Sequence, residues 1–130
     1  VYPEDGSKKY LWPGLAEHFP LAAEQPSPQE VKARLIMRQA IEAARCFEEK
    51  VLINASSGDV GAIFGIGFPP WTGGPFSFID TMGVAAFVAE ADRLAQAYGS
   101  RFTPPQLLRD MAAKGETFYT KGDTTGRIAA

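Results

Sequence analysis

The chain has 130 residues, of which 45% are hydrophobic and 22% charged, and its formal net charge is −2 at pH 7. This length fits one domain that buries roughly two thirds of its unfolded surface, and a charge this close to zero gives no reason to expect a nucleic acid or an anionic membrane as partner. The apolar runs are too short for a membrane span. The single cysteine, Cys46, excludes an internal disulfide and suits a reducing compartment such as the cytoplasm.

Residues 1–27 are predicted to form an extended arm, because prolines at positions 3, 13, 20 and 26 are spaced too closely for a stable helix. The arm is nevertheless too apolar for a free tail. We expect its large apolar side chains to pack on the body of the domain or on a neighbour that is missing from this chain. These side chains are Tyr2, Tyr10, Leu11, Trp12, Leu15 and Phe19.

A long helix is predicted from Pro28 to about Lys50. Ser27 at the N-cap, Pro28 at the first helical position and Glu30 two residues later form a capping box. Apolar residues then recur at helical spacing and form one broad face. This face contains Ala33, Ile36, Met37, Ala40, Ile41, Ala44, Phe47 and Val51. Its length and its small residues predict that this is the central helix, which another helix approaches closely.

The next stretch, from Gly58 to Gly83, is rich in glycine, proline and aromatic residues. Glycine permits tight turns, proline fixes φ, and buried aromatics hold a loop in place. We expect a short helix from Asp59 to Gly65 capped by Ser56 or Ser57, a packed loop to Gly74, and a second short helix from Pro75 to Met82.

Two further helices are predicted in the C-terminal half. The apolar spacing from Val84 to Tyr98 indicates an amphipathic helix that Gly99 ends. A last helix should follow a capping box at Thr103–Gln106 and run to Lys114, and aromatic residues 118 and 119 should return to the body. No alternating strand pattern occurs, so the predicted fold is all-α over residues 28–119, followed by a mobile tail at 120–130.

The segment from Gly58 to Gly83 also carries a long motif. It reads D-V-G-A-I-F-G from Asp59, then G-F-P-P-W-T-G-G-P-F from Gly67, and ends in D-T-M-G at Gly83. This motif resembles the C-terminal domain of the 3-hydroxyacyl-CoA dehydrogenase family. It is most similar to the second copy of that domain in multifunctional enzymes of fatty-acid oxidation, which join an enoyl-CoA hydratase to an NAD-dependent dehydrogenase. The resemblance implies a helical fold of the 6-phosphogluconate dehydrogenase C-terminal type.

The arm supports the same resemblance, because its Y-P-E-D-G and L-W-P-G-L segments are similar to the connection between the two copies. The chain begins at Val1 and shows no charged-then-apolar signal segment, and it does not end in S-K-L. We therefore expect a piece of a longer, cytoplasmic chain. The resemblance implies that the longer chain oxidises (3S)-3-hydroxyacyl-CoA to 3-oxoacyl-CoA with NAD⁺ in a Rossmann domain that lies outside this sequence.

One departure from the family suggests a structural role. The substrate-facing copy carries an active-site asparagine in an N-R-[LIV]-[LIV] context, where this chain has Ala33. We therefore expect no catalytic, cofactor-binding or metal-binding residue. We expect docking against the preceding copy and the Rossmann domain, or self-association of the isolated chain. The expected docking residues are Ile36, Ala40, Phe68, Pro69, Trp71, Gly74 and Phe76.

Several residues resemble chemical sites but have simpler interpretations. The G-I-G segment from Gly65 lacks the strand and the third glycine of a dinucleotide fingerprint, so we interpret it as a turn that seats Phe68 and Trp71. His18 has no orienting partner or pocket in the sequence pattern, and Cys46 in mid-helix is typical of a packing residue.

Asp59 and Asp80 are interpreted as a helix cap and a carboxylate that binds backbone N–H groups and holds the loop. No cluster of His, Cys, Asp or Glu has metal-ligand spacing.

Two alternatives to the structural role stay open. A module that contacts acyl-CoA would need cations for the phosphates next to an apolar slot, and the candidates are Lys8, Lys9, Arg34 and Arg38. A solvated charged face explains these residues equally well. A free-standing interaction protein is the third possibility, which the start at Val1 disfavours.

Overall fold

The computed structural model describes residues 1–119, so the predicted tail lies outside the described part of the chain. Within residues 1–119 every regular element is helical, which confirms the all-α prediction. The elements are α1 (Leu15–His18), α2 (Pro28–Glu48), α3 (Ala55–Ile66), the 3-10 turn η1 (Pro70–Thr72), α4 (Pro75–Met82), α5 (Val84–Tyr98), the 3-10 turn η2 (Ser100–Phe102) and α6 (Gln106–Lys114).

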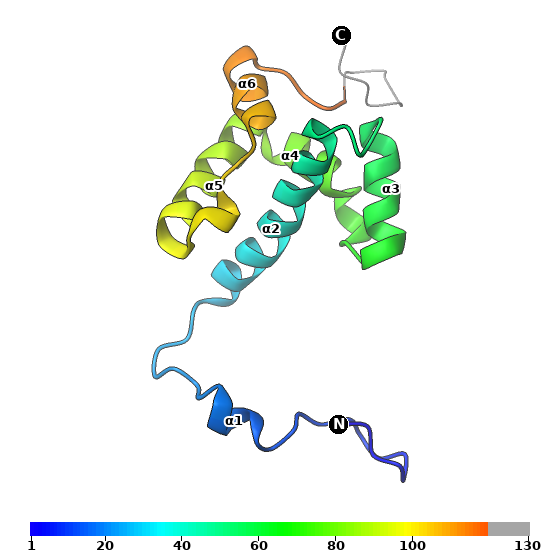
Figure 1. Ribbon diagram of the computed structural model, residues 1–130, viewed down its shortest axis with the longest axis vertical. Helices are drawn as coiled ribbons and strands as arrows, with labels where there is room; N and C mark the ends of the chain where they lie inside the picture. The colour runs from blue at the N-terminus through cyan, green and yellow to red at the C-terminus, as the bar shows by residue number, and fades with distance from the viewer. Residues whose placement is uncertain (120–130) are drawn as a thin grey trace.

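The N-terminal arm does not pack on the body of the domain, which was the first of the two arrangements predicted for it. Figure 1 shows the arm reaching away from the helical body before α2 begins, and its large apolar side chains are exposed. A four-residue helix, α1, fits between Pro13 and Pro20, and the ring of Trp12 stacks on His18 with centroids 5.7 Å apart. His18 is thus a packing residue within the arm.

Helix α2 is the centre of the fold, as its apolar face predicts. Ser27 accepts a hydrogen bond from the backbone N–H of Glu30 at 3.1 Å, which confirms the serine half of the capping box. The carboxylate of Glu30 turns instead to Arg93 of α5, at 2.9 Å. The helix ends at Glu48, two residues before the predicted end, because Lys50 adopts a left-handed conformation with φ of 61°.

The other helices of the body pack on two sides of α2. Figure 1 shows α3 on one side of α2 and α5 on the other, with α4 passing between them and α6 lying against α5. Their apolar faces meet in one core, where the rings of Phe47, Phe76 and Phe118 lie 4.7–5.6 Å apart in edge-on and tilted pairs. The predicted bounds of α4 and α5 agree with the structure, since Gly83 and Gly99 both take positive φ.

The start of α6 corrects the predicted capping box at Thr103. No side chain of that segment caps the helix, and Pro105 occupies the N-cap position. The carboxylate of Glu48, at the end of α2, accepts the N–H of Leu107 at 2.7 Å instead. The N–H of Leu107 has no acceptor within α6, and the side chain of Glu48 supplies one. This hydrogen bond joins the end of α2 to the start of α6.

Candidate functional site

Asp59 is the buried anchor of the glycine-rich segment. Asp59 is only 3% exposed. Its carboxylate accepts a hydrogen bond from the N–H of Phe76 at 2.7 Å. It also accepts from Ser77, at 3.2 Å from the N–H and at 2.7 Å from the hydroxyl. The hydroxyl of Tyr119 donates to the same carboxylate at 2.8 Å. Asp59 thus binds the first turn of α4 from α3, where the positive end of the helix dipole favours an anion.

Asp80 performs a similar task at the other end of α4. Its carboxylate accepts the N–H of Phe118 at 3.0 Å and the N–H of Tyr119 at 2.8 Å, which brings the end of the described chain back onto the core. Burial raises the pKa of Asp80, and the two backbone N–H groups oppose that rise. These contacts confirm the interpretation of Asp59 and Asp80 as carboxylates that hold the loop.

Tyr119 makes the stability of this network depend on pH in the alkaline range. Burial, together with the hydrogen bond to Asp59, raises the pKa of its hydroxyl above the usual value of 10.0. The native state therefore favours the neutral hydroxyl, and its stabilising contribution is present below about pH 10 and is lost as the pH rises above that value. We expect the free energy of urea unfolding to fall more steeply from about pH 10 to 11 in the parent chain than in Tyr119→Phe. Equal slopes would contradict the hydrogen bond.

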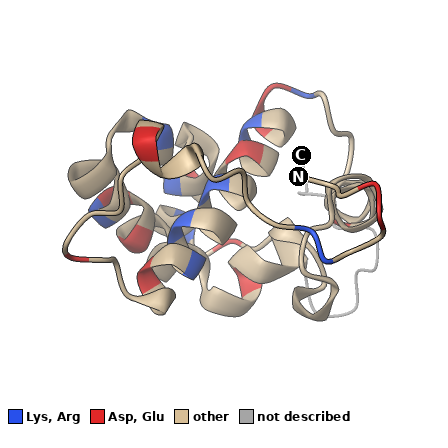
Figure 2. Ribbon diagram, turned by 90° about the horizontal axis from the view of Figure 1, so that it is seen from below, with Lys and Arg blue, Asp and Glu red and all other residues tan. Residues whose placement is uncertain are grey.

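The segment that Asp59 anchors lacks the charged side chains that are usual at a protein surface. Residues 60–79 contain no charged side chain. Figure 2, in which the charged residues are coloured, shows them spread over much of the rest of the ribbon. Helix α3 begins at Ala55, earlier than predicted, because Asn54 accepts the N–H of Ser57 at 2.8 Å and acts as N-cap in place of the predicted serines. The helix is therefore apolar on nearly all sides, yet only part of it is covered.

We use the term apolar face for the large exposed apolar side chains of this segment. Phe64 of α3 is 86% exposed and Trp71 of η1 is 85% exposed, so the prediction that the loop seats Trp71 is wrong. The remaining large exposed side chains of this face are Val60 and Ile66. A helix that is hydrophobic on all sides is normally buried. Large exposed apolar side chains on a segment without charge point to an interaction surface.

An open groove borders the apolar face between α2 and α3. It has a volume of about 390 Å³, and apolar side chains dominate its lining. Ala43 and Cys46 line it from α2, Ala62 and Ile66 from α3, and Phe68 forms part of its floor. Cys46 is half-buried here, beside Phe47 of the core, in agreement with a packing role.

The structure divides the expected docking residues into two groups. The members of the first group are buried within the domain, although Phe68 also forms part of the floor of the groove between α2 and α3. This group contains Ala40, Phe68, Gly74 and Phe76. Their side chains or backbone are covered in this chain, and docking stays a prediction for them. In the second group Trp71 is exposed and Ile36 and Pro69 are half-buried, and docking stays a prediction for these three as well.

Sequence reasoning missed Val60, Phe64 and Ile66 of the apolar face. The signal that would have found them is the absence of charge between Asp59 and Asp80. Aromatic content predicts burial in general, but it does not distinguish burial inside the domain from burial against a partner.

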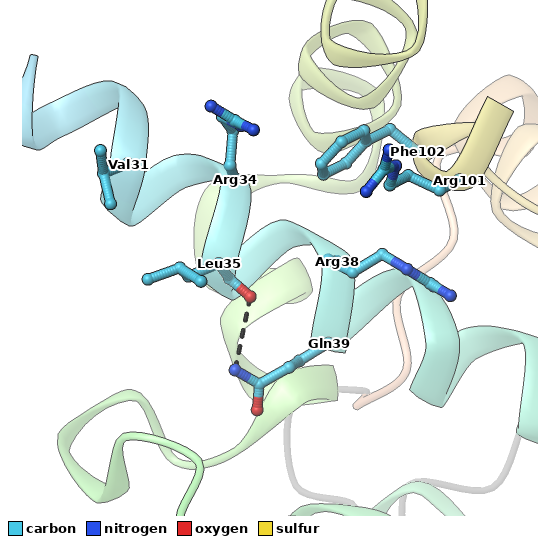
Figure 3. A pocket seen from close by; sticks show the side chains of 7 residues that line it. All are labelled: Val31, Arg34, Leu35, Arg38, Gln39, Arg101 and Phe102. Carbon is cyan, nitrogen blue, oxygen red and sulfur yellow. Dashed lines mark hydrogen bonds between the residues drawn. The ribbon is translucent and has the colours of Figure 1, made fainter. Parts of the chain in front are cut away.

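A second groove, between α2 and η2, has a different character. We call it the basic groove. It has a volume of about 430 Å³, and Figure 3 shows its lining side chains. They are Val31, Arg34, Leu35, Arg38 and Gln39 from α2, and Arg101 and Phe102 from η2. This groove brings together two of the predicted phosphate-binding cations, Arg34 and Arg38, whereas Lys8 and Lys9 lie in the arm.

Other candidate sites receive no support from the described residues. Gly67 ends α3 in a left-handed conformation, so the G-I-G segment closes a helix instead of opening one. Residues 1–119 contain no group of His, Cys, Asp or Glu arranged to hold a metal ion. Among the same residues, no helix is both long and apolar enough to cross a lipid bilayer. No protein-family model matches the chain.

Proposed function

We propose that this chain is a docking domain with a structural role. The observation that carries the proposal is the apolar face, which presents Phe64 and Trp71 almost fully to solvent on a segment without charge. Covering these large side chains favours association, because fully burying one of them is worth about 1.5–3 kcal/mol.

The motif in residues 58–83 supports a particular partner. It resembles the second helical domain of a multifunctional 3-hydroxyacyl-CoA dehydrogenase, whose fold is of the 6-phosphogluconate dehydrogenase C-terminal type. In this proposal the apolar face contacts the preceding copy of the domain and supports the NAD-dependent Rossmann domain of the longer, cytoplasmic chain. The chain itself holds neither NAD nor catalytic groups. Without its neighbours it would cover the face by self-association.

The test uses the longer chain of this proposal, which contains the preceding copy and the Rossmann domain. Oxidation of NADH by acetoacetyl-CoA is measured before and after heating, in the parent and in the double variant Phe64→Ser, Trp71→Ser. We expect turnover before heating to be nearly unchanged and the variant to lose activity at a lower temperature. Val51→Ser, which alters an exposed apolar residue outside the apolar face, is the control and should behave as the parent. A longer chain without dehydrogenase activity would overturn the proposal.

Gly61 offers a second and independent prediction. It lies on α3 with ordinary helical φ, and a Cβ added there would meet no atom within 4 Å. Gly61→Ala should therefore raise the unfolding free energy of the 130-residue chain by about 0.5–1 kcal/mol, as glycine in a helix is less stable than alanine. In the longer chain the partner would approach α3 closely at this position, so the gain should vanish or reverse. A gain of equal size in both chains, measured by urea unfolding, would mean that no partner packs against Gly61.

The alternative function, contact with acyl-CoA, is favoured by one observation. Arg34 and Arg38 line the same groove as Val31 and Leu35, so cations lie next to an apolar wall. Lys8 and Lys9 do not contribute to that groove. Calorimetric titration of acetoacetyl-CoA into the 130-residue chain tests this alternative, and the absence of heat would exclude it.

A further inference from the structure

We propose that the basic groove between α2 and η2 binds an organic phosphate. The phosphate would lie between Arg34 and Arg101, and the apolar part of the ligand would cover Val31 and Leu35. The proposal does not rest on the docking function, because none of the apolar-face residues lines this groove.

The first argument is charge. The lining contains Arg34, Arg38 and Arg101 and no acidic side chain. Arg38 is already paired with Glu42 at 2.6 Å. Arg101 forms no hydrogen bond or ion pair with any described residue. The guanidinium of Arg34 lies over the ring of Tyr98 and near the negative charge of Glu30, but it forms no hydrogen bond or ion pair with a described residue. Two guanidinium groups therefore keep their donors free for an anion, and guanidinium is the group that binds phosphate through paired N–H donors.

The second argument is that Arg34 is held in place. Its guanidinium carbon lies 4.2 Å from the centre of the Tyr98 ring, a favourable cation–π arrangement. The carboxylate of Glu30 lies close enough to Tyr98 to raise the pKa of its hydroxyl, and Glu30 is itself paired with Arg93 at 2.9 Å. An arginine that is already oriented loses less side-chain entropy when it binds a ligand.

The third argument is the apolar wall. Phe102 is almost fully buried and forms the floor of the groove, while Leu35 is 62% exposed at its edge. Figure 3 shows Val31 and Leu35 on the α2 side, with Arg101 and Phe102 coming from the opposite segment. An inorganic anion would leave this wall in water. A ligand with an apolar group beside its phosphate would cover it, and a volume of about 430 Å³ lies within the usual range for small-molecule sites.

The test is calorimetric titration of the 130-residue chain with ADP, coenzyme A and inorganic phosphate at low salt. We expect ADP and coenzyme A to bind, and inorganic phosphate to bind at least tenfold more weakly. Coenzyme A binding tighter than ADP would identify the acyl-CoA class as the source of the ligand, and equal binding would identify an adenine nucleotide. No heat with either organic phosphate at millimolar concentration would overturn the proposal.

Variants separate a defined site from general attraction to a basic surface. Arg34→Ala and Arg101→Ala should each weaken ADP binding about tenfold or more, since each removes a charge-assisted contact. Lys32→Ala removes one charge from the exposed side of the same helix and should leave binding unchanged. Leu35→Ser should weaken ADP but not inorganic phosphate. Equal losses in Lys32→Ala and Arg101→Ala would overturn the proposal. Because these titrations need no partner domain, their failure is distinguishable from failure of the docking function.

Discussion

Asp59→Ala is expected to lower the unfolding free energy of the 130-residue chain by about 3–5 kcal/mol. The substitution leaves the N–H groups of Phe76 and Ser77 and the hydroxyl of Tyr119 without their acceptor in a site only 3% exposed. Each buried donor that loses its partner costs about 1–3 kcal/mol. The loss also detaches α3 from the first turn of α4. Urea unfolding followed by far-UV circular dichroism measures the effect.

Asp110→Ala is the control for this prediction. Asp110 is an exposed carboxylate on α6 that, within residues 1–119, accepts only from Gln106, at 2.7 Å, so its loss should cost less than about 0.5 kcal/mol. Asp59→Asn is a second informative variant, since it keeps one acceptor oxygen but presents an NH₂ donor to the other donors. It should fall between the parent and Asp59→Ala. A loss below 1 kcal/mol in Asp59→Ala would contradict the buried network.

The parts of the fold that sequence reasoning predicted correctly depend on local chemistry. The helix from Pro75 to Met82 and the helix from Val84 to Tyr98 have the predicted bounds. Proline at the first helical position and glycine after the last one determine these bounds without help from distant residues. The apolar period of residues 28–48 gave the central helix for the same reason.

The parts that were missed depend on contacts between distant residues. Glu48 caps α6 although Leu107 lies 59 positions further along the chain, and Tyr119 reaches Asp59 across 60 positions. No local pattern marks such a pair. The start of α3 was missed because Asn54 competes with two nearby serines for the same capping role.

The candidate surfaces show the same distinction. Sequence composition predicted that the aromatic residues of the glycine-rich segment are buried, but the fold places Phe68 and Phe76 inside and leaves Phe64 and Trp71 outside. The basic groove required tertiary structure as well, since Arg101 comes from η2 and meets Arg34 only because η2 packs against α2.

Gly74→Ala is the second substitution with a large expected effect, a loss of about 3–5 kcal/mol in unfolding free energy. Gly74 has φ of +114°, which residues with a side chain rarely adopt and which costs on the order of 1–2 kcal/mol. A Cβ at this position would also lie 2.5 Å from Cγ and Oδ1 of Asp59. Because Asp59 is buried and fully engaged, it cannot move away without breaking its bonds to α4.

Gly83→Ala separates the two causes of that loss. Gly83 also precedes a helix with positive φ, here +88°, but a Cβ there would meet no atom within 4 Å. Gly83→Ala should therefore cost only the backbone strain, about 1–2 kcal/mol. The difference between the two variants, measured by urea unfolding, gives the cost of displacing Asp59. If Gly74→Ala and Gly83→Ala lose equal stability, the contact between Gly74 and Asp59 is not what requires glycine at that corner.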